Sequence, residues 1–120
     1  MFYSLKGMLT QKFENFLVLD IGGVGFKVFS SLATLSKVSP GTEIMVYTYT
    51  HIREDALDIF GFLTTEELSF FQKLISISGV GPRLALAILS THSPKDIVFA
   101  VLSNDAKKLS KAPGVGTKLA

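Results

Sequence analysis

The spacing of apolar residues changes once along this chain, near Thr64, and the change limits the folds that the chain can adopt. Before Thr64 come short segments rich in β-branched and aromatic residues, separated by glycine and polar turns, which is a pattern typical of strands. The expected strands lie at residues 2–10, 16–23, 25–30, 44–50 and 57–63. Five short strands indicate a small closed or partly closed barrel, because closure hides the edges of the sheet. A single helical turn expected at residues 31–37, between the third and fourth strands, favours an OB-fold barrel.

From Thr64 onward the apolar residues recur with helical spacing. Thr64 and Glu67 fit a capping box, so a helix is expected to begin at this point. Ser93, followed by proline, predicts the start of another helix, and Asn104 predicts the start of a further short one. The chain is therefore predicted to be an α+β protein.

The two halves also differ in charge, which supports a division into two domains. We expect an OB-fold barrel domain at residues 1–62 and a helical domain at residues 63–120. The first holds five Lys or Arg against six Asp or Glu, a net charge of 5 − 6 = −1; the second holds seven against four, a net charge of 7 − 4 = +3. The basic half is the better candidate for contact with an anionic partner.

A short phrase occurs twice in the basic half. It reads SGVGPRLA at residues 78–85 and PGVGTKLA at residues 113–120. In each copy the first glycine can end a helix at positive φ, and the second lets the backbone approach a ligand closely. The following helix would present unpaired backbone amides and the positive end of its dipole, and Arg83 or Lys118 would add a full positive charge.

This arrangement is typical of a phosphate-binding site. A single Gly-x-Gly between helices is usually only a tight connection, but two copies with a cation at the same offset favour contact with phosphates. Because backbone amides would face the sugar-phosphate chain, such a site would bind nucleic acid without reading its bases.

Other chemistries find little support in the residues. The chain has no cysteine and only two scattered histidines, so we expect no metal and no cofactor. It has no GxxxxGK[ST] loop and no spacing that suggests a catalytic triad, and no helix follows Gly22–Gly25 as a dinucleotide site requires. No apolar run approaches the length of a membrane span, and the first residues lack a signal pattern. We therefore expect a cytoplasmic binding protein with no membrane contact that is not an enzyme by itself.

The motifs and their order resemble the RuvA family of bacterial Holliday-junction branch-migration proteins. The resemblance covers the whole chain and rests on GGVGFKV, HIREDA and DIFGFL in the first half, followed by LISISGVGPRLALAIL and LSKAPGVGTKLA, which look like tandem helix-hairpin-helix motifs. It implies sequence-independent binding of four-way DNA junctions in recombination and repair. The DNA-binding residues that it implies are Gly79, Val80, Gly81 and Arg83 in the first hairpin, and Gly114, Val115, Gly116, Thr117 and Lys118 in the second.

The resemblance also implies an acidic pin, formed by Glu54 and Asp55, that repels phosphates near the junction centre and deters continuous duplex. Without the resemblance, these two residues would be interpreted as part of a solvated turn. The second hairpin departs from the family pattern at Thr117, where the family usually has a basic residue.

The partners implied by the resemblance are four-way junction DNA, further copies of the chain in a homotetramer or octamer, the hexameric ATPase RuvB and the junction resolvase RuvC. The family's C-terminal domain, which contacts the ATPase, is expected to be absent, because the chain ends at Ala120, shortly after Gly116. We therefore expect that the chain as given does not stimulate the ATPase motor.

Two alternatives remain open on the residues alone. A helix-hairpin-helix DNA glycosylase fragment would also contain PGVGTKLA, although such enzymes place a catalytic Asp well downstream of the hairpin. A generic single-strand-binding OB protein is the other alternative, although in the barrel half Phe and Tyr do not obviously alternate along the chain with Lys and Arg, as stacking platforms require.

Overall fold

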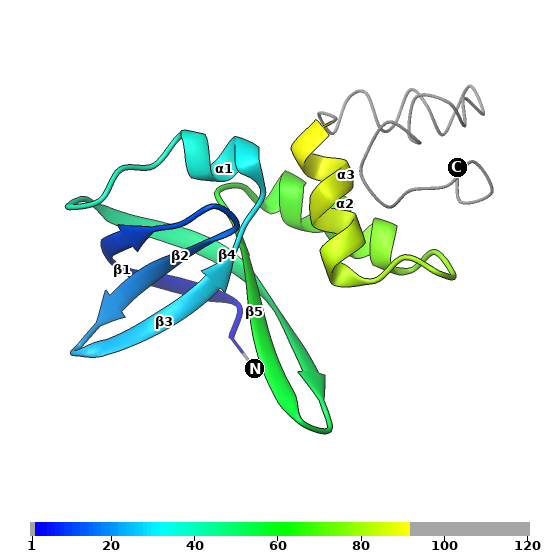
Figure 1. The fold of residues 1–120 in the computed structure, drawn as a ribbon, viewed down its shortest axis with the longest axis horizontal. Helices are drawn as coiled ribbons and strands as arrows, with labels where there is room; N and C mark the ends of the chain where they lie inside the picture. The colour runs from blue at the N-terminus through cyan, green and yellow to red at the C-terminus, as the bar shows by residue number, and fades with distance from the viewer. Residues whose placement is uncertain (1, 92–120) are drawn as a thin grey trace. The chain divides into compact units, whose positions relative to one another are not determined.

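The computed structural model describes residues 2–91 (Figure 1). The chain divides into two compact units, Met1–Leu68 and Ser69–Ala120. The expected domain limit after residue 62 coincides with the end of the last strand, and the division after Leu68 falls within the next helix. Within the described residues, no helix is long and apolar enough to cross a membrane.

The first unit contains five strands that close into a barrel. The strands are β1 (Ser4–Lys12), β2 (Phe16–Ile21), β3 (Val24–Phe29), β4 (Glu43–Arg53) and β5 (Ala56–Phe62). Their order around the barrel is β1-β2-β3-β5-β4, and β4 pairs with β1 to complete the circle. All neighbours are antiparallel except β3 and β5, which pair in parallel. Among the described residues, the α+β fold expected from the sequence is confirmed, with its five-stranded OB-like barrel.

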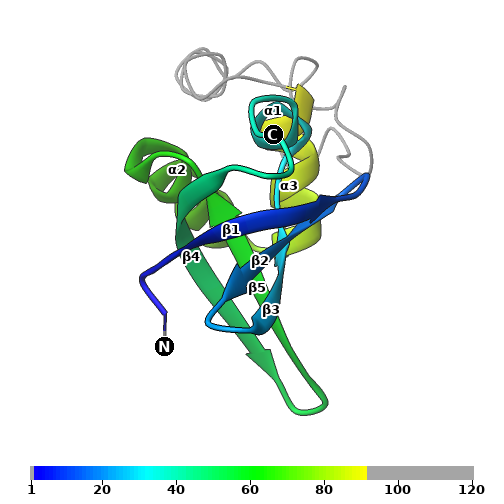
Figure 2. The ribbon, with the colours of Figure 1, turned by 90° about the vertical axis from the view of Figure 1, so that its left-hand side faces the viewer.

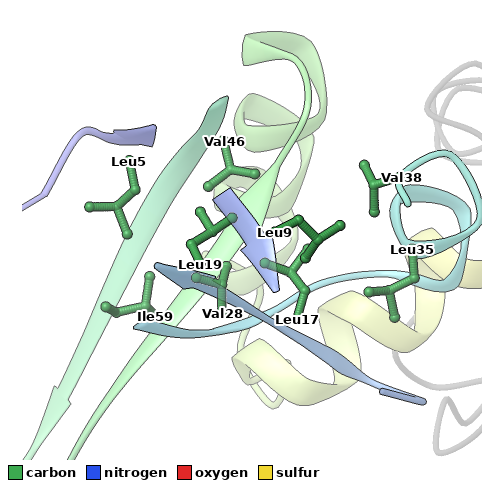
Figure 3. Packing of buried hydrophobic residues seen from close by; sticks show 9 residues of the cluster. All are labelled: Leu5, Leu9, Leu17, Leu19, Val28, Leu35, Val38, Val46 and Ile59. Carbon is green, nitrogen blue, oxygen red and sulfur yellow. The ribbon is translucent and has the colours of Figure 1, made fainter. Parts of the chain in front are cut away.

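Alternation along the strands determines which side chains enter the barrel. In β1 every second residue is buried from Leu5 to Leu9, and in β2 Leu17 and Leu19 are fully buried. These residues meet inside the barrel with partners from the other strands and from the segment after β3 (Figure 3). The buried core consists of Leu5, Leu9, Leu17, Leu19, Val28, Leu35, Val38, Val46 and Ile59. Because alternate residues face inward, a shift of one residue in any strand would expose its apolar side chains.

The connections follow local sequence signals. Gly22 and Gly23 form the tight turn between β2 and β3 with φ angles of 60° and 90°, a conformation that favours glycine. Helix α1 (Leu32–Ser36) is the single turn expected between the third and fourth strands. The Ser31 hydroxyl caps α1 by accepting a hydrogen bond from the Thr34 amide at 3.2 Å.

Two further helices, α2 (Thr65–Ile75) and α3 (Pro82–Thr91), follow the barrel. Thr64 is the N-cap of α2, as expected, because its hydroxyl accepts a hydrogen bond from the Glu67 amide at 3.1 Å. Pro82 occupies the first position of α3, where its missing N–H costs nothing. The helices expected to begin near Ser93 and Asn104 lie outside the described residues.

Candidate nucleic-acid interface

The six residues between α2 and α3 make a tight helical hairpin. The last turn of α2 is extended by hydrogen bonds from the Ser76 amide to Gln72 and from the Ile77 amide to the Leu74 carbonyl at 3.1 Å. Gly79 then takes a φ of 88°, which lies in the left-handed region and is strained for any residue with a Cβ. The positive φ expected at the first glycine of this phrase is therefore present.

Gly81 has a different role, since its φ is not positive and a Cβ placed on it would meet no atom within 4 Å. Its backbone is therefore open to an approaching group. Its carbonyl accepts the first hydrogen bond of α3, from the Ala85 amide at 3.0 Å. Gly81 thus stands at the N-terminus of α3, beside the amides that the helix leaves without helical partners.

The backbone amides of Gly79 and Gly81 make no hydrogen bond in the part of the chain that the structure describes, residues 2–91. Both residues are exposed. The Val80 amide between them instead donates to the Ile77 carbonyl at 3.0 Å, and Val80 is only 6% exposed. The hairpin therefore offers its two glycine amides to solvent, while Val80 packs inward, as its apolar side chain favours.

One cationic side chain lies beside the hairpin amides. Arg83 is exposed in the first turn of α3, two residues after Gly81, and no acidic side chain lies in that turn. An arginine beside the positive end of a helix dipole favours an anion at this point. The second copy of the phrase, Gly114, Val115, Gly116, Thr117 and Lys118, lies outside the described residues.

Glu54 and Asp55 lie at a different feature, the tip of the β4–β5 hairpin. They are the two exposed turn residues between the paired Arg53 and Ala56. The hairpin extends beyond the other strands of the barrel, as both ribbon views show (Figure 2). Across the hairpin, the Arg53 guanidinium forms an ion pair with Asp58 at 3.1 Å, so the arginine that precedes the tip is already paired with a carboxylate. The tip therefore presents two adjacent carboxylates.

An exposed apolar pair lies just below these carboxylates. Ile52 and Leu57 are cross-strand partners and are 61% and 55% exposed. They continue the stripe of Thr50 and Ile59, which are buried deeper in the barrel. The sequence did not reveal this exposed pair. Alternation along the strands predicts that both side chains face inward, and it does not show that the hairpin extends beyond the barrel at this point.

Helix α2 also carries a glutamate with a perturbed pKa. Burial raises the pKa of Glu67 above its ordinary value of 4.5, and the neighbouring Glu66 raises it further. The Lys37 ammonium and a hydrogen bond with the Thr34 side chain oppose this shift. Thr34 and Lys37 belong to the α1 segment, so the start of α2 lies beside that segment within the first unit.

Each half of the chain matches a known protein family. The family described as "RuvA N terminal domain" matches residues 1–61, and the family described as "SAM-like Helix-hairpin-helix tandem" matches residues 71–120. The second match supports the tandem helix-hairpin-helix motifs expected from the repeated phrase.

Curated relatives align with the chain along its length. The Holliday junction branch migration complex subunit RuvA of Acetivibrio thermocellus is 46% identical over 121 residues, covering 100% of this chain and 60% of the relative. The proteins of the same name from Ruminiclostridium cellulolyticum and Rickettsia bellii are 40% and 42% identical, covering 100% and 98% of this chain. The chain spans 61% and 58% of the length of these two relatives. A family match over half of the chain, together with these identities, assigns the chain: it belongs to the RuvA family.

Proposed function

We propose that this chain binds four-way DNA junctions without regard to sequence, as the DNA-binding subunit of a branch-migration complex. The observation that carries the proposal is the α2–α3 hairpin, where the exposed amides of Gly79 and Gly81 have no hydrogen-bond partner within residues 2–91. The names of the relatives, which describe subunits of Holliday junction branch migration complexes, indicate which nucleic acid such a hairpin would meet.

The hairpin would bind DNA through its phosphates. The two amides and the N-terminus of α3 would donate hydrogen bonds to phosphate oxygens, and Arg83 would supply charge. Gly81 lets the DNA backbone come close because a side chain is absent there. The second phrase would add a similar contact through the amides of Gly114 and Gly116 and through Thr117 and Lys118. Such contacts position the DNA but carry no base readout.

The carboxylates of Glu54 and Asp55 would give selectivity by repulsion. Both are exposed on a hairpin that extends beyond the barrel. Negative groups that face phosphates weaken the binding of a continuous duplex, in which phosphates run unbroken past the site. At a crossover the strands diverge and leave room for the hairpin tip. We therefore assign these residues to an acidic pin.

Four copies of the chain would match the four arms of a junction, and we propose a homotetramer, alone or as two tetramers that enclose the DNA. Symmetric assembly multiplies weak contacts without new contact residues. The motor would be the separate ATPase RuvB, since the sequence given has no GxxxxGK[ST] loop. The resolvase RuvC would act on the same junction.

The test is a gel-shift titration of this chain with a four-way junction, a linear duplex and a single strand of matched length. We expect tighter binding to the junction than to the duplex, and a strong decrease in junction affinity with salt, because each neutralised phosphate releases counterions. Equal affinity for all three would contradict junction selectivity and indicate a generic binder. Release of a damaged base from a lesion-containing duplex would indicate a glycosylase instead.

The acidic pin is tested with the double variant Glu54→Gln, Asp55→Asn. We expect its affinity for linear duplex to rise several-fold, so that its preference for the junction narrows, because the repulsion of phosphates has been removed. Glu43→Gln is the control, since Glu43 is an exposed carboxylate at the opposite end of the same strand, although it pairs with Lys6 at 3.6 Å and its replacement removes one charge rather than two. If the affinity for linear duplex rises equally in the two variants for each charge removed, the effect is one of net charge alone and the pin is excluded.

A further inference from the structure

The outer face of the barrel carries a cluster of phenylalanines that the hairpin interface does not use. Phe13 lies in the loop between β1 and β2, Phe16 begins β2, and Phe29 ends β3 as its cross-strand partner. Phe13 and Phe16 are stacked, with ring centroids 4.5 Å apart and planes 19° from parallel. Phe16 and Phe29 meet edge to face at 6.0 Å. The three rings therefore form one continuous aromatic cluster.

A lysine lies against this aromatic cluster. The Lys27 Nζ atom is 4.4 Å from the centroid of Phe16 and 5.1 Å from that of Phe29. Lys27 is exposed, and among residues 2–91 no carboxylate forms an ion pair with it. The two rings restrict the position of the ammonium through their negative faces, while its charge stays available to an anion in solvent. The cluster therefore combines an aromatic stack with an unneutralised cation.

The stack is open at one end. Phe16 has Phe13 stacked on it and Lys27 lying over its ring, so it has little face left to offer. Among residues 2–91, Phe13 has Phe16 as its single stacking neighbour, and Phe13 is 46% exposed. Its other face is therefore accessible to solvent, and a flat group can extend the stack there. Phe29 is only 6% exposed and serves as support from below.

We propose that this cluster of Phe13, Phe16, Phe29 and Lys27 is a binding site for single-stranded nucleic acid, separate from the hairpin interface. An unpaired base would stack on the open face of Phe13, and a neighbouring phosphate would pair with the Lys27 ammonium. Alternating aromatic and cationic contacts of this kind are how single strands are bound without sequence preference. In duplex DNA both faces of a base are already stacked, so the site selects unpaired strands.

The position of the cluster in the barrel also supports single-stranded nucleic acid as the ligand. Five-stranded barrels of the OB type bind oligonucleotides on the face of their second and third strands and with the loop between the first two strands. The cluster occupies both of these places, because Phe13 is in that loop and the other three residues are on β2 and β3. An acidic peptide could pair with the Lys27 ammonium, but its carboxylates would not stack on the open ring of Phe13. Unpaired nucleic acid uses both the ring and the charge.

The carboxylate of Glu14 follows Phe13 in the same loop and is exposed. It would repel phosphates that pass over the loop, and therefore limits the affinity of the site. Binding to the cluster is accordingly expected to be weaker than binding of a whole junction and to improve when this charge is removed.

The proposal is tested by fluorescence anisotropy with a labelled oligodeoxythymidylate of about 12 nucleotides, within the range that one barrel covers. We expect Phe13→Ala to weaken binding about tenfold, which is the loss of one stacked base. Lys27→Gln should weaken it less, and should reduce the slope of log affinity against log salt by about 0.7, the value for one phosphate of a single strand. Glu14→Gln should strengthen it.

Val24→Ala is the matched control, because Val24 is 56% exposed at the far end of the β2–β3 hairpin. It should bind the oligonucleotide as the unaltered chain does, and urea unfolding should show that all four variants are folded. Four-way junction binding is measured on the same samples, so that failure of the hairpin interface can be told apart from failure of this site. Unchanged oligonucleotide affinity in Phe13→Ala overturns the proposal. The proposal is also overturned if sedimentation shows that Phe13→Ala changes only the association of copies of the chain.

Discussion

At the scale of single residues, three glycines of this chain differ in how far the fold constrains them. At Gly61 a Cβ would lie 2.5 Å from Val28 Cγ1 and 3.2 Å from Val46 Cγ2, and both valines are fully buried. At Gly79 the restriction is the backbone angle, and at Gly81 there is neither a steric nor a conformational restriction in the fold. A glycine that the fold does not require is a candidate for a role in binding.

We expect Gly61→Ala to destabilise the barrel by about 1–3 kcal/mol, the usual cost of inserting a methyl group into a packed core. Urea unfolding measures this change in the free energy of unfolding. Gly25→Ala is the control within the same sheet, because its Cβ would meet Val18 Cγ1 at 3.4 Å, an ordinary contact. Equal losses in both variants would mean that the barrel interior is not tightly packed around Gly61.

Glu67 gives a prediction about pH. Its pKa is raised in the folded chain, mainly by burial, so the folded state holds this proton more tightly than the unfolded state does. Stability contributed by the protonated form is present below the ordinary value of 4.5 and is lost as the pH rises through the raised folded value. Glu67→Gln keeps an acceptor for Thr34 and removes this dependence. The urea midpoint of the variant relative to the unaltered chain should therefore rise between pH 4 and pH 7, and a constant difference would contradict the assignment.

At the scale of elements, the two glycines of the α2–α3 hairpin have different roles. Gly79 is required by the fold, and Gly81 is proposed to serve binding. Gly79→Ala should cost about 1–2 kcal/mol of stability, because a Cβ is strained in the left-handed region. Gly81→Ala should leave the free energy of unfolding unchanged, since its Cβ would enter open space.

The same open space is where a phosphate would approach, so Gly81→Ala should weaken junction binding several-fold while the chain stays fully folded. Urea unfolding and a junction titration on the same preparation measure the two effects. A Gly81→Ala variant that binds the junction as tightly as the unaltered chain would move the phosphate contact away from this glycine.

Several elements could be predicted from sequence because their signals are local. Alternation located the strands of the barrel, and the Thr64 cap located the start of α2. The end of β4 was predicted three residues short, at residue 50, although the strand continues to Arg53. The last residues of β4 pair with β5 beyond the barrel, where Ile52 is exposed, so burial no longer distinguishes strand from turn there.

The aromatic cluster could not be predicted from sequence because it depends on register. Lys12 precedes Phe13, and Lys27 lies between Phe26 and Phe29, but the order of residues does not show that Lys27 contacts Phe16, which lies on another strand. Pairing of β2 with β3 sets Phe16 opposite Phe29 and Val18 opposite Lys27, which brings the ammonium over the ring of Phe16. Cross-strand neighbours of this kind become visible only once the pairing is known.

At the scale of the whole molecule, the two proposed sites should differ in their response to salt. Binding of a junction by a tetramer neutralises many phosphates, whereas the cluster on the barrel neutralises about one per chain. We therefore expect a much steeper dependence of log affinity on log salt for the four-way junction than for the oligodeoxythymidylate. Sedimentation of the junction complex should give four chains, or eight, per junction. Equal slopes for the two DNAs would mean that one site serves both.

The parallel seam between β3 and β5 has a consequence for synthesis of the chain. Two residue pairs, Val28–Ile59 and Phe29–Phe60, join these strands, and β5 is the last strand of the barrel to be made. Until β5 has left the ribosome, the first four strands can pair only in the order β4-β1-β2-β3, so the edges of β3 and β4 that β5 will join stay unpaired. Unpaired edges invite association with other nascent chains, so the interval before β5 emerges is when this protein is most exposed to misassembly.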